Sequence, residues 1–292
     1  MKNHVAVGVD GSAESRAAAR WAAQEAVLRQ VPLRLVHAVD WPLDPVLPGL
    51  GKQDKQDVDR WADRALTETA QELHRHHPHL EITSRCPTGR PAAALAAEAA
   101  DAALLVLGSR GLGGLVGFLI GSVALSTVVA TDTPVVLVRV ADDPDGPGTD
   151  TAAEVVVGVD IHEAGDRLLA FAFEEAERRG CPLRAVHGWK MPPAYAYVPL
   201  FDPDNERDIG WSVTHMLDDM LLPWRHKFPD VRVTTNVFMG AAGERLVQAS
   251  RGAGLVVVGR HLRRSPLGVH LGPVAQAVLH HAAAPVAVIA HA

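Results

Sequence analysis

The chain contains one sequence repeat. The segment Val5-Ala-Val-Gly-Val-Asp10 returns as Val155-Val-Val-Gly-Val-Asp160, 150 residues later. Residues 32–38 return as residues 182–188 at the same offset, and residues 104–108 return as residues 255–259 at an offset of 151. Solenoid repeats have periods of roughly 20–50 residues, so this long period indicates two copies of one whole domain.

The segment between the two copies has the composition of a linker. Asp, Pro and Gly supply every position from Asp142 to Gly148. We therefore predict a first domain at residues 1–141, a linker at residues 142–152 and a second domain at residues 153–292. The length of 292 residues fits two domains of about 150 residues each.

Apolar runs alternate with helical patterns within each copy. In the first copy the runs predict five strands, at residues 5–9, 33–39, 80–85, 104–107 and 135–140. Several runs are apolar without alternation, as expected for parallel strands covered on both faces. The pattern predicts an α/β fold of two tandem Rossmann-like domains, each a five-stranded parallel sheet with helices on both faces.

Capping residues and apolar spacing mark the helices between these strands. Ser12 predicts the N-cap of the first helix, Pro91 the first turn of the third, and Ser122 the start of the fourth. The second helix has apolar residues at spacings of three and four, which predicts that they form its inward face. These residues are Val58, Trp61, Ala65, Leu66 and Leu73.

Charge and cysteine content narrow the classes of function. Lys and Arg number 28 against 34 Asp and Glu, a net charge of −6, which argues against the basic face of a nucleic-acid-binding protein. Cys86 and Cys181 form neither a disulfide framework nor a metal-binding pair, and we expect a reducing, cytoplasmic location. Residues 111–131 are uncharged, but Arg263 and Arg264 in their second-copy counterpart lead us to expect no membrane insertion.

The end of the fourth predicted strand is the strongest candidate for a binding site. Residues 108–122 hold six glycines and end in Gly121-Ser122 before a helix. Glycines let backbone approach a ligand and a helix N-terminus attracts anions, so this loop is typical of a phosphate site, with Arg110 as a further donor. The P-loop motif and the dinucleotide fingerprint are both absent. The alternative is that the glycines only permit a tight turn and close helix–sheet packing.

The spacing of these glycines resembles the ATP-binding signature of universal stress proteins. Gly108, two residues, Gly111, nine residues and Gly121-Ser122 match it, and the Val-Gly-Val-Asp10-Gly-Ser opening and the Gly89-Arg-Pro turn look like the same family. The resemblance covers nearly the whole chain, in two copies. It implies that the first and fourth strands are neighbours, with ATP, alone or with Mg²⁺, in the crevice between their ends.

The resemblance also implies which residues hold the nucleotide. Asp10 would accept hydrogen bonds from the ribose or the adenine edge, Ala38 or Val39 would offer backbone groups to adenine, and the backbone N–H groups of residues 121–123 would face the phosphates. The full set is Gly8, Val9, Asp10, Ala38, Val39, Gly89, Gly108, Ser109, Arg110, Gly111, Gly121, Ser122 and Val123. The alternatives are a helix-terminal charge for Asp10 and a plain N-cap for Ser122.

The second copy departs from this pattern. Asp160, Gly259 and Gly272 are retained, but Leu262 replaces Gly111 and Pro273 replaces Ser122. Proline has neither the N–H nor the hydroxyl that the phosphates would use. We therefore expect a weakened or lost second site, although nearby arginines leave another mode of anion binding open.

Histidines provide the remaining candidates. His74, His76, His77 and His79 predict a solvated helix end, with zinc binding as the alternative. His37 and its repeat His187 lie in apolar strands, where a packed core histidine is expected. We predict no resident metal and no catalytic residue.

Taken with the resemblance, the sequence predicts an ATP-binding regulatory protein of the stress response. The nucleotide would be held mainly by the first domain, and hydrolysis would be weak at most. Two rival functions stay open: a slow ATPase or nucleotidyl-transferring enzyme on the same crevice, and an interaction protein without nucleotide. The resemblance further implies that the two domains pair as an internal pseudo-dimer. It leaves a homodimer open and names no protein partner.

Overall fold

The structure is a computed structural model that describes residues 4–39, 52–109, 120–140, 153–163, 165–190, 203–261 and 271–291. The chain forms two compact units, residues 1–144 and 145–292. The boundary between the units falls inside the predicted linker, while the domain limits at residues 141 and 153 stay a prediction. Five residues named in the sequence analysis lie outside the described residues: Arg110, Gly111, Leu262, Arg263 and Arg264.

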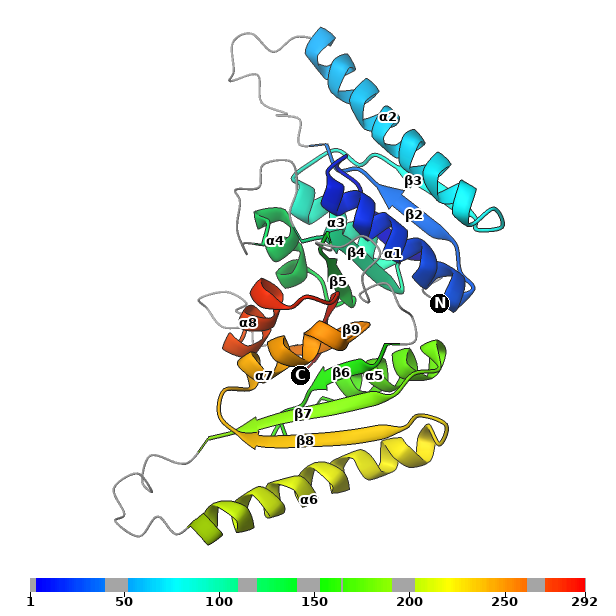
Figure 1. Ribbon diagram of the computed structural model, residues 1–292. Helices are drawn as coiled ribbons and strands as arrows, with labels where there is room; N and C mark the ends of the chain where they lie inside the picture. The colour runs from blue at the N-terminus through cyan, green and yellow to red at the C-terminus, as the bar shows by residue number, and fades with distance from the viewer. Residues whose placement is uncertain are drawn as a thin grey trace. The chain divides into compact units, whose positions relative to one another are not determined.

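The first unit alternates strands and helices, in the blue-to-green part of Figure 1. Its elements are β1 (Val5–Gly8), α1 (Ala13–Arg29), β2 (Leu33–Val36), α2 (Lys52–His76), β3 (Ile82–Arg85), α3 (Pro91–Ala100), β4 (Leu104–Gly108), α4 (Ser122–Ala130) and β5 (Val135–Val138). The strand order is β3-β2-β1-β4-β5, and the four neighbouring pairs are all parallel. The five predicted strands are therefore confirmed, each shifted by a few residues at most.

Helices cover both faces of this sheet, and two glycines show how closely they pack. A Cβ at Gly8 would lie 2.6 Å from Leu107 and 3.5 Å from Leu95 of α3. A Cβ at Gly108 would lie 2.8 Å from the backbone carbon of Glu14 in α1. Both strand ends therefore need glycine for packing, one against each helix layer.

The second unit repeats the architecture. Its elements are β6 (Val155–Gly158), α5 (Asp166–Arg179), β7 (Leu183–Trp189), α6 (Pro203–Lys227), β8 (Val233–Met239), α7 (Ala242–Ala249), a 3-10 turn (Ser250–Gly252), β9 (Leu255–His261), α8 (Pro273–His281) and β10 (Val286–His291). The order β8-β7-β6-β9-β10 matches that of the first unit, again with parallel neighbours. The repeated sequence thus folds twice into one topology.

The predicted helix starts are confirmed, but one helix face is not. Ser12 is the N-cap of α1, Pro91 begins α3 and Ser122 begins α4. In α2 the inward face includes Ala62 and Leu66, whereas Trp61 is 41% exposed. The prediction of an inward Trp61 is therefore wrong, because this side chain lies at the edge of the buried stripe. No helix among the described residues is long and apolar enough to cross a bilayer.

Candidate functional site

The carboxyl ends of β1 and β4 form the candidate site of the first unit. These two strands are neighbours, and β2 lies on the other side of β1, so the order of the chain reverses between β1 and β4. Ligands of open parallel sheets bind at such a reversal, beyond the carboxyl ends of the strands. Asp10 lies two residues after β1 and Ser109 directly after β4, so both lie at the same edge.

Asp10 stabilises the start of α1 with one of its two carboxylate oxygens. Its Oδ1 accepts hydrogen bonds from the Ser12 N–H at 3.0 Å and the Ser12 hydroxyl at 2.5 Å. Ser12 in turn accepts the Ser15 N–H at 3.1 Å as the N-cap. Within the described chain Oδ2 makes no hydrogen bond. The carboxylate thus has its helix-terminal role and still offers an acceptor to a ligand.

The start of α4 carries the free backbone donors of the site. The Gly121 N–H donates to the Ser109 carbonyl at 2.8 Å, so it is used within the protein. This revises the role expected for Gly121, from phosphate donor to helix cap. The N–H groups of Ser122, Val123 and Ala124 have no acceptor in the described part of the chain, and the side chains of Ser122 and Val123 are exposed. Three donors therefore point out of the first turn, where the helix dipole favours an anion.

Ala38 carries the free backbone groups on the side expected to hold adenine. The Val39 N–H donates to the Pro87 carbonyl at 3.1 Å, and the Val39 carbonyl accepts the Gly89 N–H at 3.0 Å. Gly89 has a φ of 132°, which favours glycine at this turn. Among the described residues nothing bonds to the N–H or C=O of Ala38. Of the two expected residues, Ala38 is the one with groups available to a base.

Val9 and His37 hold the ends of β1 and β2 together. The Val9 N–H donates to the Val36 carbonyl at 2.8 Å, and the His37 Nδ1 donates to the Val9 carbonyl at 2.6 Å. His187 makes the same bond to Val159 at 2.8 Å in the second unit. Both rings are buried, so the prediction of packed core histidines is confirmed.

Trp61 is a site residue that the sequence analysis missed. Its ring meets that of His37 edge-on, with centroids 5.1 Å apart, and lies 3.3 Å from where a Cβ of Gly11 would be. Gly11 has a φ of 77° and follows Asp10 directly. A half-exposed indole therefore borders the edge between Asp10 and Ala38. The tenth residue of α6, at the matching place in the second unit, is Ser212.

The second unit keeps the equivalent residues but surrounds them differently. Asp160 accepts the His162 N–H at 3.0 Å, and α5 begins only at Asp166, six residues later. Gly272 is the N-cap of α8, as Gly121 is of α4, and Pro273 occupies the first helical position. The first N–H donor of this helix is therefore missing, as the sequence predicted.

A histidine fills the space between β9 and the start of α5. A Cβ at Gly259 would lie 2.3 Å from Nε2 of His291, and one at Gly165 would lie 2.5 Å from its Cβ. His291 is buried and its ring centroid lies 4.4 Å from that of His261, whose Nε2 lies 3.0 Å from a Glu163 carboxylate oxygen. Arg260, at the position of Ser109, is buried too. The second unit thus fills with its own side chains the edge that the first unit leaves to smaller residues.

Comparison with known proteins decides the family. A family model described as "Universal stress protein family" matches residues 1–139 and residues 153–290. The chain belongs to the universal stress protein family. Universal stress protein Rv2005c of Mycobacterium tuberculosis is 36% identical over 293 residues, which cover 98% of this chain and 97% of the relative. A universal stress protein of Mycolicibacterium smegmatis is 32% identical over 292 residues, covering 98% and 96%.

Solved structures of universal stress proteins share the fold. A universal stress protein from Archaeoglobus fulgidus superposes with a TM-score of 0.71 over the full length of both chains, at 17% identity. In both universal stress protein domains of this chain, no three His, Cys, Asp or Glu side chains of the described residues lie close enough to share a metal ion.

Proposed function

We propose that this universal stress protein binds ATP in its first domain, across the ends of β1 and β4, and uses it as a regulatory ligand. The observation that carries the proposal is the first turn of α4. There the N–H groups of Ser122, Val123 and Ala124 lack acceptors in the described structure, beside an exposed hydroxyl. Such a turn suits phosphate oxygens, which accept several hydrogen bonds and carry negative charge.

The remaining groups at this edge suit the nucleoside. Oδ2 of Asp10 would accept from a ribose hydroxyl, and the Ala38 N–H and C=O would pair with the acceptor and the amino group on the adenine edge. The exposed part of the Trp61 ring would lie against the base. Ser109 lies within the sheet edge and positions Gly121 through its carbonyl. Mg²⁺ would arrive on the phosphates.

A regulatory role is favoured over turnover by the kind of contacts available. Residues 108–122 contain neither lysine nor carboxylate. Phosphoryl transfer usually requires a lysine or a metal-binding carboxylate at the phosphates and a residue that orients water. Backbone N–H groups bind the ground state and the transition state about equally, and uniform binding does not raise kcat. We therefore expect phosphate release far below ~1 s⁻¹, the slow end for typical enzymes.

Identification of bound nucleotide tests the proposal. The full chain is purified, denatured and cleared of protein, and the released small molecules are identified by mass. We expect ATP in the wild-type protein and little in Ser122→Pro prepared in parallel. Absence of any adenine nucleotide, together with no calorimetric response to added ATP, would favour an interaction protein without nucleotide.

A further inference from the structure

A cavity of the first domain lies at the edge of its sheet opposite to the proposed nucleotide site. It has a volume of about 520 Å³ and is lined by Ala26, Val27, residues 30–32 and residues 76–81, where α1 leads into β2 and α2 leads into β3. Both segments precede strands, whereas the proposed nucleotide site follows strands. Because all strands of the sheet are parallel, the two sites are at opposite edges.

Backbone hydrogen bonds hold the walls of this cavity in place. The Val31 N–H donates to the Ala26 carbonyl at 3.0 Å, across the left-handed residue Gln30 that ends α1. The Leu80 N–H donates to the His77 carbonyl at 3.1 Å, and the Leu33 N–H donates to the Glu81 carbonyl at 2.9 Å. The two turns are thus fixed to themselves and to each other without any ligand.

The second domain has an aromatic ring at the position equivalent to His77. Counted from the helix ends, Phe228 matches His77 and Phe173 matches Ala23. Phe228 is buried and stacks on Phe173, with centroids 5.5 Å apart. In the first domain alanine and histidine replace these two rings. The cavity beside His77 is bordered by apolar residues, among them Ala26, Val27 and Leu80, and by imidazole rings.

The polar groups of this cavity favour a positively charged guest. None of its lining residues is Lys or Arg, and Glu81 is the one formal charge when the histidines are neutral. Two helices end here, and helix C-termini carry partial negative charge. The arginines of their last turns bond within their own helices, Arg29 to Glu25 and Arg75 to the Gln71 carbonyl.

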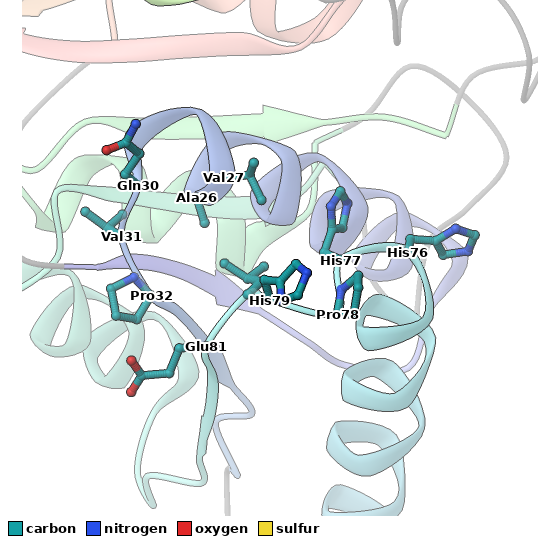
Figure 2. Close-up of a pocket in the computed structure, with 11 residues that line it drawn as sticks. Ala26, Val27, Gln30, Val31, Pro32, His76, His77, Pro78, His79 and Glu81 are labelled. Carbon is teal, nitrogen blue, oxygen red and sulfur yellow. The ribbon is translucent and has the colours of Figure 1, made fainter.

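Three side chains that line the cavity are available to bind a ligand. His77, His79 and Glu81 make no side-chain hydrogen bond or ion pair in the described part of the chain. Figure 2 shows Ala26 and Val27 of α1 facing the turn that carries His77 and His79, whereas His76 points away from them. Imidazole rings stack on planar groups, and a carboxylate accepts N–H donors from a cation.

We propose that this cavity binds a planar aromatic cation, of the amidinium or aminoheterocycle type. Its ring would lie beside His77, the counterpart of Phe228, and against Ala26, Val27 and the imidazole of His79. Its N–H groups would donate to Glu81. Nothing in this assignment depends on ATP or on the edge where the nucleotide is proposed to bind.

Two small probes of equal size and opposite charge test the proposal. Benzamidine and benzoate are titrated separately into the full chain labelled with ¹³C at histidine, and the imidazole signals are followed by NMR. We expect saturable millimolar binding of benzamidine that shifts His77 and His79 but leaves His74 unchanged. Benzoate should bind at least about fivefold more weakly, since Glu81 would repel it, and Glu81→Gln should weaken benzamidine about two- to fivefold.

A filling variant gives the control. His77→Phe places in the first domain the residue that the second domain has, and it should abolish benzamidine binding. His74→Phe puts the same ring on the exposed side of α2 and should leave it unchanged. Binding of benzoate as tight as benzamidine, no saturable shift with either probe, or unchanged benzamidine affinity in folded His77→Phe would each overturn the proposal. Because Glu81→Gln alters only an exposed side chain, it keeps the test valid if His77→Phe does not fold.

Discussion

The two domains share a strand order but differ at the edge where β1 and β4, or β6 and β9, end. In the first domain α1 packs directly on Gly108, and α4 begins with the exposed Ser122. In the second domain the His291 ring lies against Gly259, and α8 begins with Pro273. A glycine retained in a repeat is therefore no proof of a retained ligand site. At Gly259 the residue that needs the space belongs to the protein itself.

The opposite edge shows the reverse pattern. There the second domain is filled by the stacked rings of Phe228 and Phe173, while the first domain has a cavity beside His77. Each copy buries its own sheet, so a change at the edge of one domain leaves the other domain's sheet intact. The two domains have thus diverged at their edges while both sheets kept their apolar strands.

The largest effect is expected when the second domain's proline is copied into the first. Ser122→Pro removes an N–H and a hydroxyl from the proposed phosphate site, and hydrogen bonds to charged groups contribute about 1.5–3 kcal/mol each. The affinity for ATP, measured by calorimetry, should fall by about a hundredfold or more. The reverse change, Pro273→Ser, should create no second site, because Arg260 and His291 still occupy that edge. Tight ATP binding by folded Ser122→Pro would mean that the first turn of α4 does not bind the phosphates.

Alanine replacements at two glycines should show which of them packs against another element and which faces open space. In Gly108→Ala the new methyl group would meet the α1 backbone, with 2.8 Å to the Glu14 carbon, so unfolding of the first domain should become about 1–3 kcal/mol easier. Gly272→Ala, with nothing within 4 Å, should change stability by less than about 0.5 kcal/mol. Urea denaturation of both variants measures the difference. Equal stability of the two would mean that α1 does not pack on Gly108 as described.

Trp61 allows the base contact to be tested apart from the phosphates. Stacking of a base on an aromatic ring contributes about 1–3 kcal/mol, so Trp61→Ala should weaken ATP by about tenfold. Inorganic tripolyphosphate should bind wild type and variant equally, and Trp61→Phe should recover most of the loss. Trp211→Ala, an exposed tryptophan of the second domain, is the matched control. A parallel loss for tripolyphosphate would show that Trp61 acts through the fold and not on the base.

The sequence was sufficient for the architecture and for part of the site. The strands, the Ser12 cap, the start of α4 at Ser122 and the place of Asp10 follow from local patterns, because apolar runs, helix starts and strand ends depend on neighbouring residues. The role of Gly121 does not, since its N–H pairs with Ser109, twelve residues away across a loop. The spacing of apolar residues predicted that Trp61 lies on the inward face of α2, but it did not predict that Trp61 lies at the exposed margin of that face.

The filling of the second site was also beyond local patterns. His291 ends an apolar strand and its insertion beside Gly259 depends on where β10 and α5 lie in space. A signal was present in the repeat, because His291 stands where the first copy has Val140, and Arg260 stands where it has Ser109. A large polar residue that replaces a small or apolar one at a matched position therefore indicates an altered site as strongly as a lost glycine does.

The smallest effect concerns the amino end of β1, where the first domain has a buried histidine and the second has Glu154. Burial, aided by the Arg34 guanidinium, lowers the pKa of the His4 imidazole below its ordinary value of 6.5, and its Nε2 has no hydrogen-bond partner within the described chain. The unfolded chain therefore takes up this proton first, so stability is complete above pH 6.5 and falls as the pH drops below it. His4→Leu should flatten this fall by less than about 1 kcal/mol, measured by urea denaturation between pH 7 and pH 5. Unchanged pH dependence in His4→Leu would mean that His4 titrates normally.

The central claim is that one domain of this pair binds ATP and the other does not. Calorimetric titration of the nucleotide-free full chain with ATP tests it most directly, in wild type, Ser122→Pro and Asp160→Ala. We expect about one ATP per chain, with binding lost in Ser122→Pro and unchanged in Asp160→Ala. Two ATP per chain, or a single ATP that survives Ser122→Pro and is lost in Asp160→Ala, would contradict it.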